Sequence, residues 1–125
     1  MKRKILIVDD DVHVREELRL PLLLRGYEVI EASDGQEGVN LARKEKPQVM
    51  LQDILIAKLD GMRVVRLLKF DERYKDIYII AITQLGRRET QEEALRIGFD
   101  DFLVKPIEPE KVIEKIDAVF AKLGK

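Results

Sequence analysis

Five short apolar runs alternate with five amphipathic segments along the chain, and this alternation constrains the fold more than any other feature of the sequence. The runs fall at residues 5–8, 27–32, 49–52, 77–82 and 102–104. The first, Ile5-Leu6-Ile7-Val8, is continuous and rich in β-branched side chains. Such a run is typical of a strand that is buried on both faces of a parallel sheet.

The segments between the runs have the spacing of amphipathic helices. Asp11 and Gly26 bound the first, and the others fall at residues 35–44, 61–69, 89–97 and 108–122. In the last segment Val112, Ile116 and Val119 recur at steps of four and three, which gives one apolar face. Five β/α units predict an α/β fold with a doubly wound, five-stranded parallel sheet and five helices covering both faces.

Composition narrows the classes of function. The 23 basic and 24 acidic residues give a formal charge of −1, so no general basic field favours nucleic acid. The absence of cysteine and the single His13 exclude thiol catalysis and thiolate or multi-histidine metal sites, leaving oxygen ligands. No stretch approaches the ~18 apolar residues of a membrane helix. We expect one cytoplasmic domain over residues 1–125, without direct nucleic acid or membrane contact.

Polar residues stand where the predicted strands end. Asp9 and Asp10 follow the first, Asp53 the third, Thr83 the fourth and Lys105 the fifth. Each alone has a plainer explanation as a helix cap or a solvated loop residue, but open parallel sheets bind ligands at this edge. Carboxylates converging within ~5 Å would repel by roughly 3 kcal/mol per pair at an effective dielectric near 20, so they need a cation such as Mg²⁺. The lysine and threonine then offer a charge and a hydroxyl to an anion.

Four motifs together carry a resemblance that covers essentially the whole chain. They are residues 5–11, Asp53-Ile54 with Asp60-Gly61 downstream, Ile82-Thr83, and residues 98–106. The chain resembles the response-regulator receiver domain of two-component signalling, of the chemotaxis-receiver type. The resemblance implies a flavodoxin-like (βα)₅ fold with strand order 2-1-3-4-5.

The resemblance also implies the site's chemistry. Asp53 would be the nucleophile that accepts a phosphoryl group from a sensor histidine kinase or a phosphotransfer protein. Asp10 and Asp53 would bind Mg²⁺ or Mn²⁺ directly together with the backbone carbonyl of Leu55, and Asp9 would bind it through water. Lys105 would pair with the phosphoryl group.

A conformational switch is implied as well. Thr83 would move to bond a phosphoryl oxygen, and Phe102 would turn inward to fill the vacated space. The change would reach a surface around the fourth helix, fifth strand and fifth helix, which would bind a downstream output protein or domain or form a phosphorylation-dependent dimer. The chain would then be a phosphoacceptor, not an enzyme acting on a separate substrate, although it would assist its own phosphorylation and dephosphorylation. The Lys105-Pro106 bond is expected to be cis.

The sequence departs from the family pattern near the nucleophile. Gln52 stands where an apolar residue is usual, and a buried amide must find partners or cost a few kcal/mol. A core glutamine with its hydrogen bonds satisfied is favoured over a regulatory residue. Leu55 and Leu85 flank the expected path of the hydrolytic water and offer no polar group to it, which favours slow loss of the phosphoryl group. Gln84 beside them is bulkier than the small residue usual there and would narrow access. The alternative is that the leucines only cover the edge of the site and that Gln84 itself orients a water molecule.

The first predicted helix has two unusual features. Pro21 lies inside it, at a cost of ~3 kcal/mol unless the helix bends. Leu20, Leu23 and Leu24 widen its apolar stripe, which favours additional core contact.

Three other functions fit the sequence less well. A haloacid-dehalogenase-like phosphatase needs a second acid two residues after the nucleophile, where this chain has Leu55. A flavodoxin-like cofactor binder needs a phosphate loop after the first strand, where Asp9-Asp10-Asp11 would repel phosphate. A degenerate receiver that signals without phosphorylation is disfavoured because all the expected site residue types are present.

Overall fold

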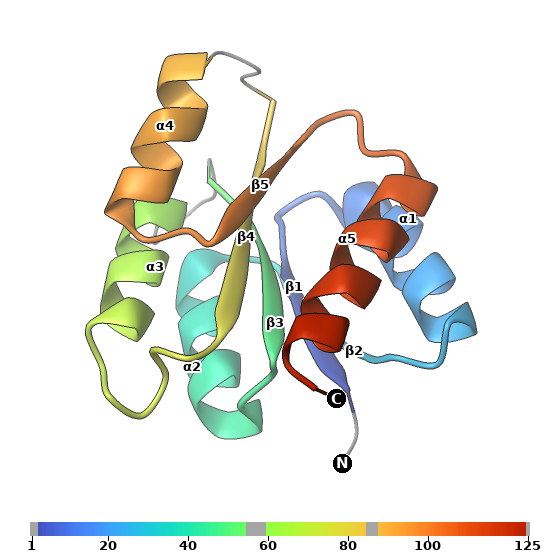
Figure 1. The fold of residues 1–125 in the computed structure, drawn as a ribbon, viewed down its shortest axis with the longest axis horizontal. Helices are drawn as coiled ribbons and strands as arrows, with labels where there is room; N and C mark the ends of the chain where they lie inside the picture. The colour runs from blue at the N-terminus through green and yellow to red at the C-terminus, as the bar shows by residue number, and fades with distance from the viewer. Residues whose placement is uncertain (1–2, 55–59, 85–87, 125) are drawn as a thin grey trace.

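The computed structural model describes residues 3–54, 60–84 and 88–124, and it contains the predicted sheet and helices (Figure 1). In chain order the elements are β1 Lys4–Val8, α1 Val12–Leu24, β2 Glu28–Ala32, α2 Gly35–Glu45, β3 Val49–Asp53, α3 Gly61–Lys69, β4 Tyr78–Thr83, α4 Arg88–Ile97, β5 Asp101–Val104 and α5 Pro109–Lys122. The strands pair in parallel in the order β2-β1-β3-β4-β5. The doubly wound fold and its strand order are therefore confirmed.

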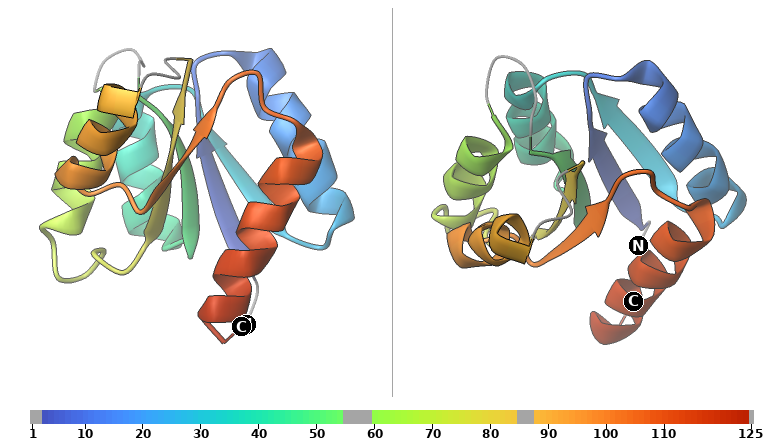
Figure 2. Two further views of the ribbon diagram at one scale, coloured as in Figure 1. Left: turned by 45° about the horizontal axis from the view of Figure 1, so that its top comes forward. Right: turned by 90° about the horizontal axis from the view of Figure 1, so that it is seen from above.

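Two hydrophobic clusters lie on opposite faces of the sheet (Figure 2). Alternate residues of β1 point to opposite sides, so Leu6 and Val8 belong to the cluster under α2, α3 and α4, whereas Ile5 and Ile7 belong to the cluster under α1 and α5. All five residues of β3 are buried. A central strand covered on both faces is the reason that its sequence reads as a continuous apolar run, interrupted only at its end.

Aspartate caps fix the starts of three helices at the carboxyl edge of the sheet. The side chains of Asp11, Asp34 and Asp60 accept hydrogen bonds from backbone amides in the first turns of α1, α2 and α3. Each such cap contributes about 1 kcal/mol. The caps anchor the chain directly after the strands, which is where the candidate site lies.

The leucines that widen the apolar stripe of helix α1 are more exposed than predicted. The helix continues through Pro21 to Leu24, and the backbone amide of Arg25 closes it on the carbonyls of Pro21 and Leu22. Leu20 and Leu24 are 54% and 90% exposed, so the expectation of additional core contact was wrong. The core takes only the face of α1 that carries Leu18 and Leu22. Within the described ranges, no helix has the length and apolar character needed to cross a membrane.

Candidate functional site

Three carboxylates meet at the carboxyl edge because β1 and β3 are neighbours. Val8 pairs with Gln52 in the register, which places Asp9 beside Asp53. Asp9, Asp10 and Asp53 each offer an oxygen atom within 4.8 Å of the other two. Asp9 and Asp53 are 0% and 6% exposed, whereas Asp10 is open to solvent. The predicted convergence of these side chains is confirmed.

Lys105 approaches this group from the end of β5. Its Nζ atom lies 3.0 Å from Oδ2 of Asp9 and 3.5 Å from Oδ2 of Asp53. Its backbone amide donates to the carbonyl of Thr83 at 2.7 Å, and the Lys105-Pro106 peptide bond is cis, as predicted. Burial lowers the pKa of Lys105, but the two carboxylates outweigh burial and raise the pKa above its usual value. The side chain therefore stays positively charged at neutral pH.

Among the described residues, the site carries more negative than positive charge. Three carboxylates there face the ammonium group of Lys105. Oδ2 of Asp9 is buried and, within the described ranges, accepts no directed hydrogen bond beside that ion pair, while Oδ1 accepts from the amide of Asp11 at 2.9 Å. Buried charge without full compensation is unfavourable. The oxygen donors fit a hard divalent cation such as Mg²⁺ or Mn²⁺, which would restore the balance.

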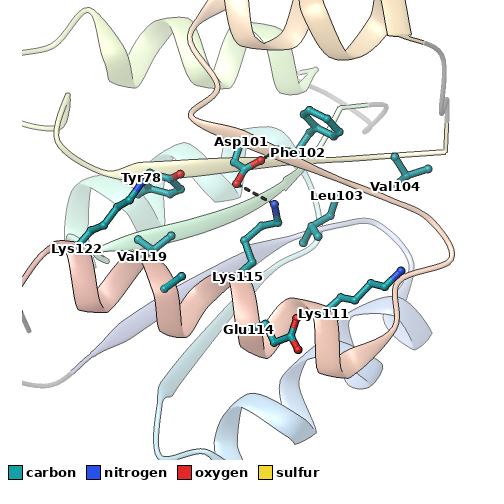
Figure 3. A pocket seen from close by; sticks show the side chains of 11 residues that line it. Tyr78, Asp101, Phe102, Leu103, Val104, Lys111, Glu114, Lys115, Val119 and Lys122 are labelled. Atoms are coloured by element: carbon teal, nitrogen blue, oxygen red, sulfur yellow. Dashed lines mark hydrogen bonds and ion pairs between the residues drawn. The ribbon is translucent and has the colours of Figure 1, made fainter.

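Thr83 and Phe102 lie on one face of the sheet. Phe102 pairs with Ala81, and both belong to the side covered by α2, α3 and α4. Thr83 is two residues after Ala81, so its side chain points to the same face, and it is 3% exposed. Phe102 is half-buried, and Figure 3 shows its ring directed away from Lys115 and α5. The two predicted switch residues thus have neighbouring places on adjacent strands.

A groove of about 560 Å³ lies between β5 and α5, apart from the three carboxylates (Figure 3). Its lining includes Tyr78, Leu103 and Val119. The ion pair between Lys115 and Asp101, 2.9 Å long, crosses it from α5 to β5. Of the predicted site residues, Phe102 lines this groove.

Two contacts of the backbone beside Asp53 were not found from the sequence. A Cβ atom on Gly61 would lie 2.6 Å from the carbonyl oxygen of Asp53 and 2.7 Å from Cα of Ile54, so α3 starts in close contact with the end of β3. Nε2 of Gln52 donates to the same Asp53 carbonyl at 2.9 Å. Its Oε1 atom has no hydrogen-bond partner within the described ranges, so the expectation of a fully satisfied core glutamine was wrong. The glycine after Asp60 was a signal for the first contact, but no sequence signal indicates the second.

Some predicted residues lie outside the described part of the chain. These are Leu55, whose carbonyl was expected to bind the metal, and Leu85, expected to shield the site from water. Both assignments stay predictions.

The chain matches the family model of the response regulator receiver domain over residues 5–117. It belongs to that family. Members of this family act as phosphoacceptor signalling domains, and their acidic cluster corresponds in kind to the one described above.

Curated relatives support the same assignment. The chain is 40% identical over 124 residues to a probable transcriptional regulator ycf27 of Guillardia theta, covering 99% of this chain and 48% of the relative. It is 34% identical over 122 residues to the phosphate regulon transcriptional regulatory protein PhoB of Pseudomonas aeruginosa, covering 98% of this chain and 53% of that protein. The chain thus spans about half the length of these relatives.

Among solved structures, the chemotaxis response regulator CheY4 of Vibrio cholerae has a TM-score of 0.89 to this chain. The two are 29% identical, and the match covers 95% of this chain and 99% of the other. This receiver domain therefore has the same fold along nearly its whole length.

Proposed function

We propose that this receiver domain accepts a phosphoryl group on Asp53 from the phosphohistidine of a sensor histidine kinase or phosphotransfer protein, with Mg²⁺ bound beside it. The observation that supports this most is the meeting of Asp9, Asp10 and Asp53 within 4.8 Å, with Lys105 Nζ 3.5 Å from the Asp53 carboxylate. Asp53 is the natural acceptor because it ends the central buried strand, with the acidic pair and the lysine both close to its carboxylate.

In the transfer, a carboxylate oxygen of Asp53 forms the new bond to phosphorus. The P–N bond of the phosphohistidine breaks, and its electron pair returns to the imidazole ring. Phosphoryl transfer has a loose transition state, so alignment and charge neutralisation account for most of the catalysis. Lys105 neutralises charge on the phosphoryl oxygens from one side. A cation held by Asp10, Asp53 and, through water, Asp9 supplies further neutralisation when bound.

Phosphorylation then shifts the domain between two conformations. Thr83 bonds a phosphoryl oxygen and Phe102 turns inward, which changes the surface of α4, β5 and α5. The shared sheet face of these two residues supports this coupling. The groove between β5 and α5 offers the output surface to a downstream protein or domain, or to a second copy in a phosphorylation-dependent dimer.

The names of the relatives suggest the setting of this switch. Several are transcriptional regulators about twice as long as this chain. We propose that an output protein or a linked output domain contacts DNA, and that this domain, within residues 1–125, does not. Its cytoplasmic location and its assistance to its own dephosphorylation belong to the same proposal.

The proposal is tested by treating the protein with a small acyl phosphate and Mg²⁺ and measuring covalent phosphate by intact mass. We expect one phosphoryl group on the native protein, none on Asp53→Asn, and none when a chelator removes divalent cations. Asp117→Asn is a matched control, because Asp117 is a carboxylate on α5 that is bonded to Arg25 and Tyr27, far from Lys105. Equal labelling of native protein and Asp53→Asn would refute the assignment.

A further inference from the structure

Gln52 is a buried amide in an apolar environment. It sits on β3 between Val8 and Ala81 of the neighbouring strands and is 0% exposed. Val8 and Ala81 both belong to the hydrophobic cluster under α2, α3 and α4. The Gln52 oxygen Oε1 is buried and has no hydrogen-bond partner within the described ranges. An apolar side chain of the same size would leave no such unpaired group, so the fold alone does not account for a glutamine here.

What the glutamine does provide is a bond to the backbone of the phosphoacceptor. Its Nε2 atom donates to the carbonyl of Asp53 at 2.9 Å. The other side of that same peptide unit is also held, because the amide of Ile54 donates to the carbonyl of Ile82 at 3.1 Å. Gly61 closes on the carbonyl from α3, leaving no room for a side chain. The peptide that follows the nucleophile is therefore fixed at both of its polar atoms.

The orientation of this peptide determines where the Asp53 side chain points. Rotation of the peptide plane changes the backbone angle of Asp53 and moves its carboxylate relative to Asp9, Asp10 and Lys105. Reactions that depend on alignment lose about 10²-fold when a reacting group is displaced by roughly 1 Å. A bond that holds the carbonyl of Asp53 thus acts directly on the reaction geometry.

We infer that Gln52 is a positioning residue, whose amide fixes the Asp53 peptide for phosphoryl transfer and cation binding. The unpaired Gln52 oxygen makes the core less stable than an apolar side chain would. The inference rests on the function proposed above. It assigns a role to a side chain that touches neither the phosphoryl group nor the cation.

The test replaces the amide by a side chain of similar shape, in Gln52→Met. We expect the melting temperature without Mg²⁺ to rise by about 2–5 °C, because an unpaired buried oxygen is removed. The phosphorylation rate at saturating acyl phosphate should fall by about 10-fold and the Mg²⁺ affinity by several-fold, with little change in the donor concentration for half-maximal rate. The matched control is Met50→Leu, an apolar exchange on the same strand and the same sheet face.

A measurement without phosphorylation separates this inference from the proposed function. Amide hydrogen exchange, followed by NMR, should be faster at Ile54 and Gly61 in Gln52→Met than in the native protein or Met50→Leu. Faster exchange together with slower labelling supports the positioning role. Native rates of labelling and exchange in Gln52→Met would overturn it, and so would a melting temperature well below that of the native protein, since the amide would then serve stability alone. If native protein and Asp53→Asn label equally, the proposed function fails, whatever the exchange shows.

Discussion

The amino edge of the sheet, where its strands begin, and the carboxyl edge, where they end, each carry a cluster of carboxylates and cations. The balance of charge differs between these two clusters. At the amino edge, Asp117 of α5 accepts hydrogen bonds from Arg25 at 2.8 and 3.1 Å and from the hydroxyl of Tyr27. The Tyr27 ring stacks on Phe120, with the ring centroids 5.2 Å apart. Arg3 also lies beside this cluster and acts on both Asp117 and Tyr27. The carboxylate at this edge is therefore fully paired with cations, and the cluster ties α1 to α5.

At the carboxyl edge, the described residues place three carboxylates, Asp9, Asp10 and Asp53, beside one ammonium group, which pairs with Asp9 and Asp53. The surplus of negative charge has no structural advantage, because like charges held together oppose folding. A carboxylate that is paired with cations stabilises the fold, whereas a partly buried surplus of carboxylates is typical of a site that binds a ligand. The contrast between the two edges supports, independently of the family, a ligand-binding role for the carboxylates at the carboxyl edge.

Removing a carboxylate from the carboxyl edge should give the largest effect. We expect Asp9→Asn to weaken Mg²⁺ binding by about 10- to 100-fold, the range found when groups that support a metal site are replaced. Isothermal titration of chelator-treated protein measures this. The comparison fails if Asp117→Asn, at the amino edge, weakens Mg²⁺ binding as much as Asp9→Asn does.

Removing the carboxylate of the amino edge should lower the stability of the protein instead of its Mg²⁺ affinity. Asp117→Ala removes the acceptor of the Tyr27 hydroxyl, which belongs to a residue that is 4% exposed, and of the solvent-exposed guanidinium of Arg25. We expect the free energy of unfolding to fall by about 1–3 kcal/mol, as is usual when a buried hydrogen-bond partner is removed. Urea denaturation gives the value. Unchanged stability would mean that this cluster does not tie α1 to α5.

Removing a negative charge from the carboxyl edge should raise the free energy of unfolding. Without divalent cations, Asp53→Asn removes one of three mutually repelling carboxylates, and we expect the protein to gain about 1–2 kcal/mol of unfolding free energy. Saturating Mg²⁺ should stabilise the native protein and leave Asp53→Asn nearly unaffected. A loss of stability in Asp53→Asn without cations would show that Lys105 already balances the site.

The smallest expected effect is a change with pH in the stability that Tyr27 contributes at the amino edge. Burial, followed by the hydrogen bond to Asp117, raises the pKa of Tyr27 from 10.0 to about 12. Because the folded state holds this proton more tightly, the stabilisation is complete below pH 10 and is lost as the pH rises toward about 12. Denaturation of native protein and Tyr27→Phe across this range should show the native advantage shrinking with pH. A constant difference would mean that Tyr27 ionises alike in both states.

Much of the fold and of the site was predictable because parallel strands impose simple geometry. Continuous apolar runs such as residues 49–51 occur where both faces of the sheet are covered, and the ends of adjacent strands bring residues such as Asp9 and Asp53 together across a long sequence separation. The strand order alone places these residues side by side, so their proximity can be predicted without knowing how the side chains pack.

What could not be predicted depends on packing and on pairings without a local signal. The rotation of α1 is set by its contact with the sheet and α5, which leaves Leu20 and Leu24 in solvent. Arg25 and Asp117 are 92 residues apart, and nothing in either neighbourhood indicates that they pair. The bond from Gln52 to the Asp53 carbonyl depends on a side-chain rotamer, which residue spacing does not specify.

The close contact of Gly61 with the end of β3 has a mechanical consequence. With no side chain between them, the start of α3 is seated directly on the backbone of Asp53 and Ile54, so a shift of that backbone would be passed directly to the helix. The nine residues of α3 span about 13 Å, so a tilt of about 10° at its start would move the far end by roughly 2 Å. That far end leads into Phe70, which is 84% exposed. Small rearrangements at the phosphoacceptor would be amplified at this aromatic side chain, on the opposite side of the domain from α5.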